Sequence, residues 1–130
     1  MDLEEHPPDS SHVCRRNLIK NNLITKVGRD YHSSVGMFAG YTEGLVIENN
    51  ELADMPYTGI SVGWGWTSEK TPLKNNLIRR NRIHNIMNLL ADGAGIYTVS
   101  KQPGTTIVEN YVLILFALRG LESFLFQAFI

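Results

Sequence analysis

The residues best suited to chemistry are Asp54 and Asp92, each of which precedes a short β-prone segment that begins with glycine. Two carboxyl groups on one side of a molecule can cleave a glycosidic bond, one protonating the leaving oxygen and the other acting as nucleophile or base. A separation of roughly 5 Å would give retention and roughly 6.5–9.5 Å inversion, and the sequence does not choose between them. The alternative is that both are turn residues, because Asp is common before a proline such as Pro56 and Asp-Gly pairs are common in turns.

Two tryptophans follow the first carboxylate and could hold a sugar. Trp64 and Trp66 are separated by Gly65, so both side chains point to the same side if the segment stays extended. Aromatic rings exposed in a groove are suited to stacking on sugar rings. The alternative is that these tryptophans cover the core beneath the long loop 64–75.

Three further side chains are candidates for substrate binding. Tyr57 and Tyr97 could hydrogen-bond a substrate, and the alternative is that they are buried tyrosines whose hydroxyl groups are satisfied internally. His84 directly follows the apolar Ile83, and a lone histidine in such a place is more often structural. His32 is a weaker candidate of the same kind.

The sequence predicts no cofactor and no metal. The single cysteine, Cys14, excludes an internal disulfide framework and a cysteine-rich zinc site. The carboxylates are too scattered for a calcium site, and the segment 63–66 lacks the Lys-Ser/Thr pair of a phosphate-binding loop.

The charge balance argues against nucleic acid and membrane partners. Twelve basic and thirteen acidic side chains nearly cancel, so no bulk field attracts a polyanion or an anionic bilayer. Arg79, Arg80 and Arg82 form the only basic cluster along the chain. They are either the solvated rim of a strand or a phosphate-binding patch.

The candidate residues lie within a repeat that runs along the chain. Four segments share one template, in which an apolar residue, two variable residues, an asparagine, a variable residue and an apolar residue follow one another. The template asparagine falls at steps of 28, 31 and 29 residues, at Asn22, Asn50, Asn81 and Asn110. Between them recurs a glycine followed by a β-prone run, in the segments 36–40, 59–63 and 95–99.

A parallel solenoid explains this repeat. One coil cannot bury its own apolar face, but coils stacked about 4.8 Å apart share a core and pair their strands. An asparagine corner tolerates the left-handed backbone conformation, and stacked asparagines can hydrogen-bond as a ladder. Helical repeats and leucine-rich repeats fit less well, because the apolar runs are short and the period is long. The sequence therefore predicts an all-β, right-handed parallel β-helix of three to four coils over 13–112.

The two ends depart from the repeat. We expect an irregular segment over 1–12, which lacks the basic-then-apolar order of a secretion signal. The apolar tail 113–130 is expected to be a helix that caps the core or an extension foreign to the fold. A membrane span is the third alternative for the tail, but charged residues interrupt it near its middle.

The segments 50–66 and 76–100 resemble the catalytic core of bacterial right-handed parallel β-helix glycoside hydrolases of pectate-lyase-like fold. This group includes α-L-fucosidase and xylanase members. The specific parts are the runs PYTGISVGW, from Pro56, and DGAGIYT, from Asp92, and the coil at 32–52 is similar too. The resemblance covers about residues 10–112. This chain departs from the family in having Ala53 where a histidine often precedes the aspartate, and in having far fewer coils.

The resemblance implies hydrolysis of a polysaccharide or oligosaccharide, with Asp54 and Asp92 as the catalytic carboxylates. It also implies that the chain is a fragment of a parent protein that is secreted or periplasmic. A non-catalytic β-helix that binds carbohydrate is the alternative. A polysaccharide lyase, with the arginine cluster at 79–82 as its base, ranks lower. The sequence does not indicate the oligomeric state.

Overall fold

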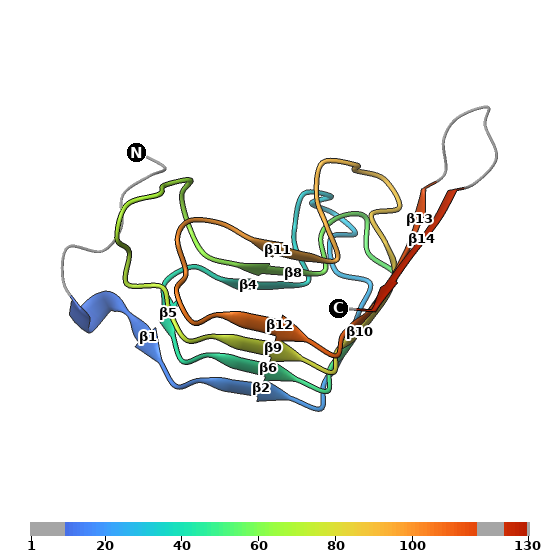
Figure 1. The fold of residues 1–130 in the computed structure, drawn as a ribbon. Coiled ribbons are helices and arrows are strands. Elements are labelled where there is room, and N and C mark those ends of the chain that lie inside the picture. Colours follow the sequence, from blue (N-terminus) through green and yellow to red (C-terminus); the bar gives the residue numbers. More distant parts are fainter. Residues whose placement is uncertain (1–9, 117–123, 130) are drawn as a thin grey trace.

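The computed structural model describes residues 10–116 and 124–129, and in them the chain winds into a parallel β-solenoid (Figure 1). Three stacks of short strands form its walls, and we call them sheets B, C and D. Sheet B contains β2 (Leu18–Lys20), β6 (Val46–Glu48), β9 (Leu77–Arg79) and β12 (Thr106–Val108). Sheet C contains β3 (Leu23–Thr25), β7 (Glu51–Ala53), β10 (Arg82–Ile86) and β13 (Tyr111–Phe116), and ends with β14 (Phe124–Phe129). Sheet D contains β4 (Met37–Ala39), β8 (Ile60–Val62) and β11 (Ile96–Thr98).

A small fourth pairing precedes sheet B. The strands β1 (Cys14–Arg15) and β5 (Thr42–Glu43) run parallel, after a short 3-10 turn, η1 (Ser10–His12). The described residues contain no α-helix, and no helix among them is long and apolar enough to cross a bilayer. The predicted fold class, an all-β parallel β-helix of three to four coils, is confirmed.

The core lies where the template predicts it. The first apolar position of each repeat pairs with its counterpart in the next coil, from Ile19 to Ile47 and from Ile47 to Ile78. The buried Ile47, Ile78, Leu52 and Ile83 are inaccessible to solvent. Each such side chain contributes about 1.5–3 kcal/mol by leaving water. Stacking the coils therefore supplies the stability that no single coil could have.

The predicted asparagine ladder is present. The Nδ2 atom of Asn22 donates to Oδ1 of Asn50, that of Asn50 to Asn81, and that of Asn81 to Asn110, at 2.9–3.0 Å. The backbone N–H of each of the first three donates to the same Oδ1 atom. The ladder therefore joins consecutive coils through side chains as well as strands.

The left-handed position is not the one predicted. It falls on the residue before each ladder asparagine, and φ there is between 54° and 60°, at Asn21, Asn49, Arg80 and Glu109. The ladder asparagine itself turns inward, where its amide must meet the next coil. The exposed residue before it takes the left-handed conformation instead, and its identity varies between coils because its side chain takes no part in the ladder.

The expected capping helix is also corrected. Tyr111–Phe116 continues sheet C in parallel with β10, and β14 pairs with β13 in antiparallel register. Val112 and Ile114 are buried while Leu113 is half-buried, which is the alternation of a strand. An apolar segment that begins in register with a sheet gains its hydrogen bonds by extending that sheet. The segments 1–9 and 117–123 lie outside the described residues.

Candidate functional site

Asp54 stands directly after β7, at the start of the turn that leads to sheet D. Its φ of 56° is left-handed, as is that of Lys26 in the coil before and of Asn85 in the coil after. Asn85 Nδ2 donates to Asp54 Oδ1, and Thr25 Oγ1 donates to Oδ2 at 3.3 Å. The carboxylate is exposed, yet both its oxygens accept bonds from neighbouring coils, which orient it.

A hollow of about 470 Å³ opens beside Asp54, and we call it the Asp54 hollow. Its walls come from the turn 26–32 of one coil, from the start of the turn 54–59, and from Asn88 and Leu89 of the next coil. The basic side chains that line it are Lys26, Arg29 and His32, and Asp54 is the single acidic one.

Asp92 lies in the turn 87–95, one coil further along, and is exposed. The hydroxyl group of Tyr57 donates to the backbone oxygen of Asp92 at 3.3 Å. Gly93 packs so closely on Tyr57 that a Cβ atom would stand 2.9 Å from Cε2 of the ring. Burial raises the pKa of Tyr57, and the negative charge of Asp92 raises it further. The Asp92 carboxylate therefore lies near the Tyr57 phenol.

The two carboxylates lie on corresponding turns of neighbouring coils but have different surroundings. Both turns join sheet C to sheet D, on adjacent coils (Figure 1). Asp54 lines the hollow, whereas Asp92 does not, and no hydrogen bond between described residues joins them. That they act together as a catalytic pair stays a prediction.

A second pocket, of about 150 Å³, lies on the outer face of sheet D. Phe38, Ser61 and Tyr97 are the middle residues of β4, β8 and β11, and they pair in register across the sheet. Trp64 and Trp66 add their rings from the loop after β8. We call this pocket the aromatic slot. The remaining lining residues are Gly63, Gly65 and Val99.

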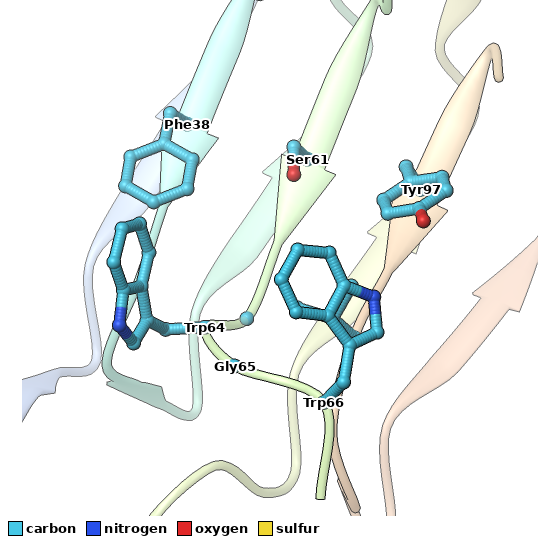
Figure 2. A pocket seen from close by; sticks show the side chains of 8 residues that line it. Phe38, Ser61, Trp64, Gly65, Trp66 and Tyr97 are labelled. Atoms are coloured by element: carbon cyan, nitrogen blue, oxygen red, sulfur yellow. The ribbon is translucent and has the colours of Figure 1, made fainter. Parts of the chain in front are cut away.

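The aromatic slot has two ring-bearing sides. Trp64 meets Phe38 edge to face, with ring centroids 5.8 Å apart and an interplanar angle of 76°. Figure 2 shows Trp66 on the side of Tyr97, with the small Ser61 between the two pairs of rings. An apolar cavity of about this volume holds one six-membered ring such as benzene.

Glycines bring both tryptophans to this slot. Gly63 and Gly65 have φ of 113° and 70°, so the segment bends rather than staying extended as assumed from the sequence. A Cβ atom on Gly63 would collide with the backbone oxygen of Val99. The two tryptophans share a pocket because of these bends, not because of strand alternation.

The other predicted binding residues fall in two places. Tyr97 lines the aromatic slot, whereas Tyr57 is not among its lining residues and bonds the backbone oxygen of Asp92. His84 lies apart, on β10 of sheet C, where its Nε2 atom is 2.9 Å from Oε1 of Glu51. That hydrogen bond lowers the pKa of Glu51. The weaker candidate His32 lines the Asp54 hollow.

Sequence reasoning missed Phe38 and Ser61 in the aromatic slot, and it missed Thr25 and Asn85, which orient Asp54. Aligning the three glycine-led segments would have put Phe38, Ser61 and Tyr97 in one column. The hydrogen bonds to Asp54 have no such signal, because one donor lies at the end of β3 and the other at the irregularity within β10.

The arginine cluster has other partners. Arg79 pairs with Glu48 at 3.2 Å, Arg80 with Glu109, and Arg82 with Glu51 at 3.6 Å. None of the three lines the Asp54 hollow or the aromatic slot. Within residues 10–116 and 124–129, no three His, Cys, Asp or Glu side chains gather as a metal site would require.

Comparisons with known proteins give one relevant finding. No protein-family model matches the chain, and no curated protein matches it. A solved structure named "Glycoside hydrolase" is similar to it, with 38% sequence identity and a TM-score of 0.79. The similarity covers 83% of this chain but 18% of that one, so this chain spans less than a fifth of its length. The predicted resemblance to a glycoside hydrolase is thereby confirmed.

Proposed function

We propose that this chain is the glycan-binding and glycan-cleaving section of a glycoside hydrolase. The aromatic slot holds a sugar ring of a polysaccharide or oligosaccharide, and Asp54 and Asp92 supply the two carboxyl groups. The observation that carries the proposal is the aromatic slot, which lies on the outer face of the strands that Asp54 and Asp92 precede. The 38% identity to a protein named glycoside hydrolase supports it.

The surroundings of the two carboxylates suit different roles. Asp54 accepts hydrogen bonds at both oxygens, which suits a nucleophile or base, because that role needs an oriented lone pair rather than a proton. Asp92 lies beside the Tyr57 hydroxyl, in the turn that leads to β11 of sheet D. It would act as the acid that protonates the leaving oxygen.

The test is hydrolysis by the purified chain, followed as new reducing ends on a panel of plant and host oligosaccharides. We expect Asp54→Asn and Asp92→Asn each to lower turnover by about 10²-fold or more, as loss of an acid or base does. Asp30→Asn, an exposed aspartate in the turn 26–36, is the control and should keep full activity. Unchanged turnover in both site variants would contradict the assignment.

Binding can be measured separately from cleavage. The protein has two tryptophans, and both line the aromatic slot, so their fluorescence reports directly on a ligand there. Trp66→Ala should weaken glycan binding by about tenfold, within the range for loss of a stacked ring. Asp54→Asn should leave this signal in place. A glycan that quenches the fluorescence of the native protein and of Asp54→Asn equally, but is cut by the native protein alone, would support both the binding and the cleavage that we propose.

A non-catalytic carbohydrate-binding β-helix is the second candidate. It is favoured by one observation, that no carboxylate lines the aromatic slot. It predicts glycan binding by tryptophan fluorescence and no cleavage of any sugar in the panel. A parent protein outside the cytoplasm fits either candidate, and fractionation of the source cells would test that.

A further inference from the structure

We infer that the Asp54 hollow selects glycans with an acidic group, a carboxylate or a sulfate ester, on the sugar bound there. The inference rests on the proposed function in so far as it names the class of glycan for the same site. It concerns binding selectivity, so it can be tested whether or not cleavage occurs.

The charges of the hollow carry the argument. Both oxygens of Asp54 are bonded to the neutral donors Thr25 and Asn85. None of the ion pairs between described residues includes Lys26, Arg29 or His32. Elsewhere among the described residues, four of the five arginines and two of the four lysines pair with a glutamate. The hollow therefore contains basic groups that form no ion pair with a carboxylate of the described residues, and an anionic ligand would pair with them.

The turn that bears these groups is fixed in place. Lys26 N donates to the backbone oxygen of Ala53 at 3.3 Å, which ties the start of the turn to the next coil. Gly28, with φ of 80°, lies against Pro56, and a Cβ atom there would stand 2.8 Å from Pro56 Cγ. The backbone that bears these basic groups is thus fixed before any ligand arrives, so that binding has to order their side chains but not the turn itself.

The other walls suit a sugar rather than a nucleic acid. Leu89 is 60% exposed, and with Pro56 it offers an apolar surface to the carbon face of a sugar ring. Asn88 adds an amide that can hydrogen-bond hydroxyl groups. No Phe, Tyr or Trp side chain among the described residues lines the hollow, so a nucleobase would find only the small imidazole ring of His32 to stack on. An acidic sugar uses all of these walls at once.

The test is calorimetric titration of the full chain with pairs of ligands that differ in charge. The first pair is a short oligogalacturonate and its methyl ester, and the second is a sulfated galactan oligosaccharide and its desulfated form. We expect at least one acidic member to bind about tenfold more tightly than its neutral partner, as charge-assisted hydrogen bonds do. The preference should fall as salt rises from 0.05 to about 0.5 M. The pair that shows the larger preference identifies the acidic group as carboxylate or sulfate.

Variants locate the effect. Lys26→Gln with Arg29→Gln should abolish the preference while circular dichroism stays unchanged. The matched control is Lys70→Gln with Lys101→Gln, two exposed lysines on another part of the surface that also take part in none of the ion pairs between described residues. The control should keep the preference. Equal affinity for charged and neutral ligands would overturn the inference, and so would an equal loss in the control, which would indicate a bulk charge effect.

Asp54→Asn separates this inference from the proposed function. It should abolish cleavage and keep or strengthen the binding of the acidic ligand, because a like charge is removed. A preference for acidic ligands without any cleavage supports the inference and contradicts the hydrolase proposal. Cleavage without a preference for acidic ligands supports the hydrolase proposal and contradicts the inference.

Discussion

The turn from sheet B to sheet C has two residues in every coil, whereas the turn from sheet C to sheet D differs in length each time. The first kind occupies 21–22, 49–50, 80–81 and 109–110, and the second occupies 26–36, 54–59 and 87–95. In the short turns, the ladder asparagines of neighbouring coils bond to one another. In two of the long turns, charged side chains line the Asp54 hollow and form no ion pair among the described residues.

This difference separates stability from function within one coil. A side chain that recognises the next coil is not available to a ligand, and its position cannot change without breaking the stack. A long turn lies outside the stack, so its length and composition are constrained far less. Asp54 combines the two properties. Thr25 and Asn85 of the neighbouring coils hydrogen-bond its carboxylate, and the hollow that it lines is open to solvent.

The largest expected effect comes from breaking the ladder. Asn81 is 1% exposed, and its side chain takes part in four hydrogen bonds, with Asn50, Asn110 and the backbone oxygen of Ile47. Asn81→Ala should lower the free energy of unfolding by about 3 kcal/mol or more, because several buried groups lose their partners at once. Urea denaturation measures this. Asn88→Ala, in a long turn, should cost less than about 1 kcal/mol, and equal losses would refute the contrast.

The next effect tests how a long connection holds its shape. Gly63→Ala places a methyl group against the backbone oxygen of Val99 at a φ of 113°. We expect a loss of about 2 kcal/mol and a shift in tryptophan emission, because Trp64 and Trp66 follow directly. Gly40→Ala is the control, since its Cβ would be 3.5 Å from the Phe38 ring, an ordinary contact. A Gly63→Ala protein with unaltered emission would show that the bend does not position the slot.

The stacked strands and short turns are predictable from the sequence, because each coil makes the same contacts with the next. The ladder at Asn22, Asn50, Asn81 and Asn110, and the glycine-led strands, follow from spacing alone. Spacing marks each corner but not which of its two residues turns inward. The sequence therefore places the left-handed conformation one residue too late. For the tail, the sequence leaves a capping helix and an extension foreign to the fold as alternatives, and the register with β10 that makes 111–116 a strand is a tertiary contact.

The site is predictable only in part. The chemical types of Asp54, Asp92 and the tryptophans were evident, but their surroundings depend on turns of unequal length, which carry no repeat. The Asp54 hollow also contains Lys26, Arg29 and His32, because the turn of one coil packs against Pro56 of the next. No spacing along the chain indicates that contact.

The smallest expected effect compares paired with unpaired charges. Glu43 on β5 bonds Arg15 at 3.1 Å and Lys74 at 3.3 Å, and the hydrogen bond from Arg15 holds its pKa below the ordinary value of 4.5. Because its folded pKa is lowered, the unfolded state binds more protons as the pH falls. The stabilising contribution is therefore present above about pH 4.5 and is lost as the pH drops through the folded pKa.

Glu43→Gln should consequently lower the urea midpoint slightly at pH 7 and make no difference near pH 2, where the native glutamate is also neutral. Arg29→Gln, in the Asp54 hollow, should leave stability within about 0.5 kcal/mol at pH 7, because no carboxylate of the described residues pairs with it. A larger loss for Arg29→Gln than for Glu43→Gln would mean that the hollow is held together by its own charges. Those charges would then be structural, and the distinction between the two kinds of turn would fail at the place where function is proposed.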